Sequence, residues 1–191
     1  ADYENVAYRM PAKFGSIKRC SVQRDPDSAK RNLNMYVISE DNFGKLTTTN
    51  STIKNNLKTW LNQYRMINDT IDILDPFVIN LGIEFQIRPK ANVDKYTLLD
   101  AAIAALAADF DTTLYIGEAL YISDIYSRLN AVDGVLDVTK VKITNKISGQ
   151  YASTVFDVNS NLSPDGSYLI APANCIFEIK YPAVDIKGKI K

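Results

Sequence analysis

The chain has 191 residues, of which 46% are hydrophobic, and its 22 Lys and Arg residues balance its 22 Asp and Glu residues. This length allows one large domain or two small ones with real cores. The neutral balance argues against a global field that would attract nucleic acid or an anionic membrane. The chain has no histidine, which excludes Ser-His-Asp and Cys-His catalysis and His-ligated metal sites. An enzyme would have to use carboxylates, Lys or Tyr.

The first predicted elements are a helix and two strands. The helix begins after Asp2, a suitable N-cap, and stops at Pro11; its apolar residues at helical spacing are Tyr3, Val6, Ala7 and Met10. Strands are predicted at Ile17–Gln23 and Leu33–Ser39, with a turn at Asp25-Pro26-Asp27 between them, and the second strand is expected to pair with the first. A second turn is predicted at Asp41-Asn42-Phe43-Gly44.

The next helix is clearly amphipathic, with Asn50 or Ser51 as its N-cap. Its single apolar stripe consists of Ile53, Leu57, Trp60, Leu61 and Tyr64. Trp60 lies in the middle of the stripe, so we expect it to be buried against the first sheet. A short strand at Ile71–Leu74 ends at Asp75-Pro76. Residues 1–75 are therefore predicted to form a first α+β unit.

A period of two marks the strand that follows. Its alternate apolar residues are Phe77, Ile79, Leu81, Ile83, Phe85 and Ile87, and mostly polar residues lie between them. This pattern is typical of a strand with one face on a core and one face in water. The strand is expected to turn at Arg88-Pro89, in an antiparallel or mixed sheet that is covered on one side.

Two helices and a strand are predicted next. Asp94 is expected to cap a helix whose apolar face consists of Leu99, Ile103, Leu106 and Phe110, and whose alanines allow close approach to the sheet. Ser123 is expected to cap a shorter helix that carries Ile125, Tyr126 and Leu129. The turn Val132-Asp133-Gly134-Val135 leads into a strand that reaches Ile143. Residues 76–147 form the second predicted α+β unit, with the order strand–helix–helix–strand.

The remaining residues, 148–191, are predicted to be a polar loop and C-terminal strands that complete a sheet. Ser163-Pro164-Asp165-Gly166 is a strong turn signal, and Cys175, Phe177, Ile179 and Tyr181 alternate as in a strand. The predicted fold class is therefore α+β. It consists of two small α/β sandwich units, each with two helices packed on a short mixed or antiparallel sheet.

Few motifs suggest chemistry. Asp109-Phe110-Asp111 has the Asp-x-Asp spacing that holds a divalent metal in sugar-nucleotide transferases. Two solvated carboxylates at a helix end are the favoured interpretation, because no nucleotide-binding loop accompanies them. A basic cluster contains Lys13, Lys18, Arg19 and Arg24; a solvated face or a subunit contact is favoured over nucleic acid. The distant Cys20 and Cys175 are interpreted as two buried thiols. No residue is assigned to catalysis, to a cofactor or to a metal.

Several segments in order resemble the baseplate wedge proteins of contractile-tailed bacteriophages, the group that includes the baseplate-J-like proteins. Near the N-terminus these are Asp2-Tyr3-Glu4, Phe14–Arg19 and Asn34–Ile38. The resemblance continues through Leu61–Ile67, Ile71–Val78, Gly117, Ser123–Ile125 and Val132–Val135. No single motif is specific, and the order and spacing of the segments over roughly residues 2–145 carry the resemblance. The opening Ala in place of Met agrees with a C-terminal or middle fragment of such a protein.

The resemblance implies a structural role without catalysis or cofactor. The expected partners are copies of the chain itself and other wedge proteins, in a virion baseplate assembled in the host bacterial cytoplasm. Nucleic acid, membrane and small-molecule substrates are not expected as partners; the longest apolar stretch, Ala101–Ala108, is too short to span a bilayer. The 11 tyrosines agree equally with an interface and with ordinary half-buried positions. Two alternatives stay open: a small carboxylate-dependent enzyme that resembles a glycosyltransferase, and a generic ligand-binding α+β domain.

Overall fold

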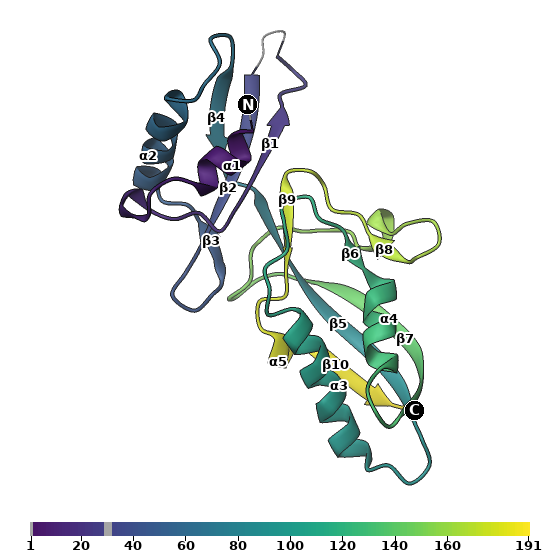
Figure 1. Cartoon of the computed structure of the whole chain (residues 1–191). Coiled ribbons are helices and arrows are strands. Elements are labelled where there is room, and N and C mark those ends of the chain that lie inside the picture. Colours follow the sequence, from purple (N-terminus) through teal and green to yellow (C-terminus); the bar gives the residue numbers. More distant parts are fainter. Residues whose placement is uncertain (1, 29–31) are drawn as a thin grey trace. The chain divides into compact units, whose positions relative to one another are not determined.

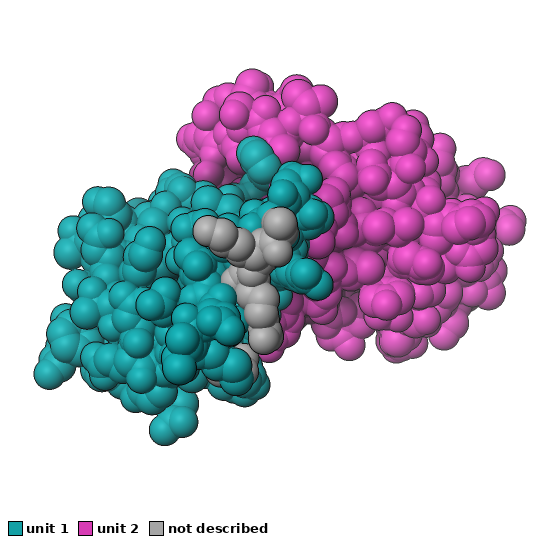
Figure 2. Space-filling model, turned by 90° about the horizontal axis from the view of Figure 1, so that it is seen from above, with its two compact units in different colours: residues 1–77 teal, residues 78–191 magenta. Residues whose placement is uncertain are grey.

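The computed structural model describes residues 2–28 and 32–191 and has an α+β fold (Figure 1). It divides into two compact units, Ala1–Phe77 and Val78–Lys191, which Figure 2 colours teal and magenta. Each unit has a separate cluster of buried apolar residues. No helix among the described residues is both long enough and apolar enough to cross a membrane.

The sheet of the first unit is built around β2 (Asn32–Glu40). β2 pairs antiparallel with β1 (Arg19–Arg24) and with β3 (Leu46–Thr48), and parallel with β4 (Thr70–Leu74). The predicted pairing of the first two strands is therefore confirmed. The predicted turn at Asp41–Gly44 is also confirmed: the Asp41 side chain accepts hydrogen bonds from the backbone N–H groups of Phe43 and Lys45.

Helices α1 (Tyr3–Tyr8) and α2 (Ser51–Asn62) supply the rest of this core, and a short 3-10 helix, η1 (Ala12–Phe14), lies between α1 and β1 in the chain. The predicted caps are confirmed, because Asp2 accepts from the N–H of Asn5 and Asn50 accepts from the N–H of Thr52. Leu57 and Leu61 of α2 are buried with Met35 and Val37 of β2.

The expectation that Trp60 is buried against the sheet is wrong. Trp60 is only half-buried at the margin of the core, and its indole Nε1–H donates a 2.8 Å hydrogen bond to the backbone carbonyl of Val6. Its ring also contacts the exposed ring of Tyr64, with 5.2 Å between centroids. An indole with its N–H on a carbonyl of α1 suits a helix–helix contact better than an apolar interior.

The sheet of the second unit is built around the long strand β5 (Phe77–Pro89). β7 (Val135–Lys146) pairs antiparallel with β5, β10 (Ile186–Ile190) pairs parallel with it, and β9 (Cys175–Glu178) also pairs with it. A small antiparallel sheet of β6 (Leu120–Tyr121) and β8 (Tyr168–Leu169) completes the unit. The predicted strand after Gly134 is confirmed and extends three residues beyond Ile143.

Three expectations for β5 need correction. Phe77 is 56% exposed, so the buried alternation begins at Ile79, and the strand continues through Pro89, which pairs with Val135. The other face is wet only from Glu84 onward, because Asn80 and Gly82 are buried. Asn80 donates to a carboxylate oxygen of Glu178 and accepts from the N–H of Ala152, so the chain after β7 covers this half of the strand.

Helices α3 (Lys95–Asp109) and α4 (Ile122–Asn130) pack on the face of this sheet from which Ile83, Phe85 and Ile87 project. Figure 1 shows α3 along β10 and α4 along β7. Asp94 caps α3 as predicted, accepting from the N–H of Thr97. The centre of the buried stripe differs from the prediction by one position: it consists of Leu98, Ala102 and Leu106. Leu99, Ile103 and Phe110 are half-buried beside it.

The prediction that Ser123 caps α4 is wrong. The helix begins at Ile122, and no side chain caps it. Instead, the backbone carbonyl of Ser167 accepts from the N–H groups of both Ile122 and Ser123, at 2.8 and 3.1 Å. A loop distant in the sequence therefore supplies the acceptor that a cap residue would otherwise provide.

The C-terminal residues belong firmly to the second unit. The predicted loop from Ser148 contains the 3-10 helix η2 (Asn159–Asn161), and the turn at Ser163–Gly166 is confirmed by a 2.9 Å hydrogen bond between the Gly166 N–H and the Ser163 carbonyl. The strand predicted through Tyr181 ends at Glu178, and a short helix, α5 (Pro182–Asp185), precedes β10. Ile176, Phe177 and Ile186 are buried.

Candidate functional site

The carboxylates of the Asp-x-Asp motif lie at the end of α3, at the surface. The Asp109 carboxylate is 3.0 Å from Nε of Arg128, and both side chains are about half exposed. Asp111 is exposed. The structure therefore assigns Asp109 to an ion pair that joins α3 to α4. Among the described residues, no group of three or more His, Cys, Asp or Glu side chains could hold a metal ion together.

A groove of about 380 Å³ lies beside Asp109. Leu106, Phe110 and Leu114 form its apolar wall, and the carboxylates of Asp109, Glu118 and Asp124 line it; we call this feature the acidic groove. Glu118 accepts a 2.6 Å hydrogen bond from the Tyr115 N–H, and Asp124 lies in the first turn of α4, where the helix dipole favours a negative charge. The chemistry of this lining suits a basic partner with some apolar surface.

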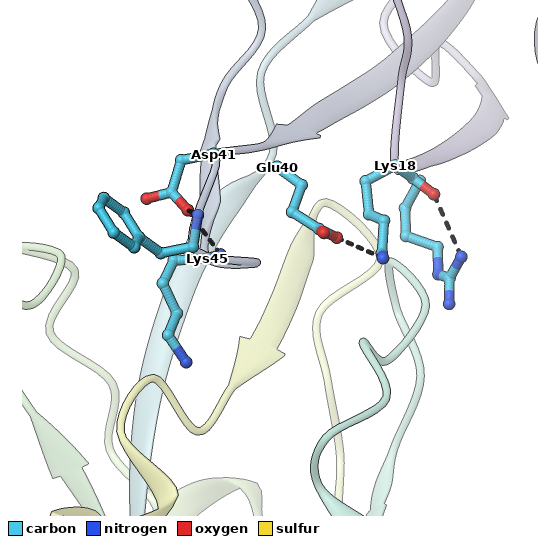
Figure 3. Close-up of polar contacts among 6 residues, drawn as sticks. Lys18, Glu40, Asp41 and Lys45 are labelled. Carbon is cyan, nitrogen blue, oxygen red and sulfur yellow. Dashed lines mark hydrogen bonds and ion pairs between the residues drawn. The ribbon is translucent and has the colours of Figure 1, made fainter.

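The basic cluster predicted near the N-terminus is dispersed over several elements. Lys13 lies in η1, over the ring of Phe14, and Arg24 lies at the exposed end of β1. Figure 3 shows Lys18 paired with the carboxylate of Glu40, which ends β2. Arg19 donates to the backbone carbonyl of Lys18 at 3.1 Å. Part of the positive charge is therefore used within the unit.

The two cysteines are free and buried, as predicted, and they lie in different units. Burial raises the pKa of the Cys20 thiol to about 12, and burial also raises that of Cys175. A thiol that resists ionisation is a poor nucleophile at neutral pH. The local environment thus favours structural roles for both.

A buried polar network ties the loop after β7 to the second sheet. Asp185 is buried and accepts hydrogen bonds from the Tyr151 hydroxyl at 2.5 Å and from the Tyr181 N–H at 3.0 Å. The bond to Asp185 is the main reason that the pKa of Tyr151 is raised to about 12. These groups are hydrogen-bond partners of one another, so we interpret the network as part of the packing of the unit.

One surface was missed in the sequence, namely the outer face of the second sheet. Lys140 and Lys142 of β7 and Lys187 and Lys189 of β10 lie on either side of Glu84 and Gln86 of β5. We call these six residues the lysine face. The alternation Ile-Lys-Gly-Lys-Ile at residues 186–190 was the available signal, but the parallel partner of this short strand is about a hundred residues away in the chain.

Comparison of the sequence with known protein families and with curated proteins finds no match.

Proposed function

We propose that the chain is a structural piece of a phage baseplate wedge subunit that works by assembly contacts with copies of itself and with other wedge proteins. The observation that carries this proposal is the ordered resemblance over residues 2–145. A ring component needs rigid units that hold geometry and exposed surfaces that bind neighbours. Two separately packed cores and several charged surfaces are in keeping with that role.

The principal alternative, a metal-dependent enzyme, depends on Asp109 and Asp111. The Asp109–Arg128 ion pair weighs against it, because a guanidinium already compensates the carboxylate that would have to bind the metal. A half-exposed pair of this kind adds at most about 1 kcal/mol to stability.

Thermal unfolding in the presence of Mg²⁺ or Mn²⁺ tests this alternative. A ligand that binds only the folded state raises the melting temperature by mass action. We expect no shift for the chain itself, and the same behaviour from Asp109→Asn combined with Asp111→Asn. An ion-dependent increase that disappears in the double variant would revive the enzyme interpretation.

The wedge proposal itself is tested on phage particles. The parent protein, expressed at full length, should associate with itself or with tail proteins, and antibodies against this chain should label the baseplate end of the tail in electron micrographs. Label confined to capsids or absent from virions, together with failure of the parent protein to bind any tail protein, would contradict the proposal.

A further inference from the structure

The lysine face forms a regular block across three strands. In the strand register, Lys187, Glu84 and Lys142 lie opposite one another in one row. Lys189, Gln86 and Lys140 lie in the next row. Because residues two apart on a strand share a face, all six side chains project from the same side of the sheet. The block carries four positive charges and one negative charge.

These lysines are exposed and border a depression of about 320 Å³. Within the described residues, no ion pair of 4.0 Å or less joins Glu84 to any of them. Lys140 and Lys142 are neighbours on the same face of β7, as Lys187 and Lys189 are on β10, so like charges lie close together along each strand and Glu84 offsets only one of the four. An occupant with negative charge would therefore relieve repulsion that the isolated unit leaves in place.

The opposite side of the same unit has the complementary charge. The segment from Lys95 to Asn130, which contains α3 and α4, has five carboxylates and two basic side chains, a formal charge of −3. Its acidic groove holds three of those carboxylates beside an apolar wall. Asp109 is paired with Arg128, so Glu118 and Asp124 supply the charge that is left for a partner. Since α3 and α4 pack on the face from which Phe85 projects, the acidic groove and the lysine face lie on opposite sides of the sheet.

We propose that the lysine face of one copy of this chain binds the acidic groove of a second copy. This inference rests on the proposed assembly function and identifies the surfaces that would carry it. The contact is heterologous, because two different surfaces meet, and repetition leads to a closed ring or an open filament. A carboxylate surface fits better than a nucleic acid: Glu84 lies in the centre of the block, and the aromatic residue that borders the depression, Phe85, is buried and cannot stack on bases.

Sedimentation of the full chain over a concentration series tests the proposal. We expect association at about 20 mM salt that weakens strongly at about 500 mM, where exposed charges are screened. Lys142→Glu with Lys187→Glu should abolish association. The control, Lys58→Glu with Lys90→Glu, makes the same change of charge at exposed sites outside the lysine face and should leave association unchanged. Circular dichroism establishes that each variant is folded.

A charge exchange supplies the decisive measurement. Glu118→Lys with Asp124→Lys reverses charge in the acidic groove and should also abolish self-association. Mixing these groove variants with the lysine-face variants places opposite charges together again and should restore association in a one-to-one mixture. Restoration cannot come from misfolded chains, so it would support the pairing directly.

Three outcomes would overturn the proposal. If the chain associates and the lysine-face variants associate equally well, the contact lies elsewhere and the wedge proposal is unaffected. If the chain stays monomeric at high concentration and low salt, this contact does not exist, and the phage-particle experiment alone decides the wedge proposal. If the lysine-face variants aggregate more than the unsubstituted chain, the lysines of β10 and β7 protect the edges of the sheet from aggregation instead.

Discussion

Cys20 shows how packing sets chemistry at a single residue. Its thiol is buried on β1, where burial outweighs the opposing effect of the Tyr8 hydroxyl, and its pKa rises from 9.0 to about 12. Between those two pH values the unfolded chain has lost the proton and the folded chain keeps it. The contribution to stability is therefore fully present below pH 9 and declines as the pH rises through this window.

Alkylation with iodoacetamide at pH 8 should report this protection. In a Cys175→Ser variant, which leaves Cys20 as the single thiol, we expect labelling in the native state to be at least about tenfold slower than in urea, because burial limits both access and thiolate formation. Mass spectrometry follows the reaction, and Cys20→Ser gives the corresponding rate for Cys175. Equal native and unfolded rates at Cys20 would mean that β1 is open to solvent.

Trp60 is the second residue whose position can be tested. Trp60→Phe keeps an aromatic ring but removes the indole N–H, which leaves the Val6 carbonyl with only the 3.2 Å hydrogen bond from the Arg9 N–H. We expect a loss of about 1 kcal/mol in unfolding free energy. Trp60→Ala should lower the unfolding free energy by about 2 kcal/mol more than Trp60→Phe does, because the ring contacts are lost as well. The loss is smaller than expected for a ring that is fully buried. Urea unfolding followed by circular dichroism measures both, with Tyr64→Phe as a near-neutral control. A Phe variant as stable as the unsubstituted chain would mean that the indole hydrogen bond does not contribute to stability.

At the scale of elements, the start of α4 depends on the loop of residues 163–167. Asp165 accepts hydrogen bonds from the hydroxyls of Ser163 and Ser167 and from the Ser167 N–H, which lower its pKa to about 2. Those bonds fix the loop whose Ser167 carbonyl accepts from the first N–H groups of α4. The loop thus acts as a cap in place of the adjacent serine.

Paired substitutions separate the two caps. Ser123→Ala should change unfolding free energy by less than about 0.5 kcal/mol, whereas a true N-cap would cost about 1 kcal/mol. Asp165→Asn should lower the melting temperature at neutral pH. Since the folded pKa of Asp165 is depressed, this difference should be complete above pH 3.8 and vanish as the pH falls through 2. Scanning calorimetry from pH 2 to 7 measures both variants. A larger effect from Ser123→Ala would restore it as the cap.

The same element shows which features the sequence could predict. Asp2, Asn50 and Asp94 act through residues two or three positions ahead, so local patterns identified these caps correctly. Ser123 failed because its competitor, Ser167, reaches the helix only through the tertiary fold. C-terminal strands were expected to complete a sheet, but the position of β10 and its parallel partner were not predicted, because its pairing with β5 spans the whole second unit. The candidate surfaces show the same difference between local and tertiary features. The sequence shows the separate charged side chains, but the lysine face forms only because β10 pairs with β5.

At the scale of the molecule, the two units have no buried core residue in common among the residues that the structure describes. Leu57, which is fully buried, belongs to the core of the first unit, and Leu106, which is equally buried, belongs to that of the second. A chain that divides in this way is expected to open one unit without the other, because cooperative units usually follow shared packing. Native-state hydrogen exchange resolves such openings.

Leu57→Ala and Leu106→Ala test this independence against each other. Each should reduce stability by about 2–5 kcal/mol through the lost apolar contacts and the cavity that remains. Hydrogen exchange with mass spectrometry should show that Leu57→Ala accelerates exchange in α2 and β2 while β5 and α3 keep their protection, and that Leu106→Ala does the reverse. The two variants serve as controls for each other. If either substitution accelerates exchange equally in both units, the chain unfolds as one cooperative body, and each unit needs the other to remain folded.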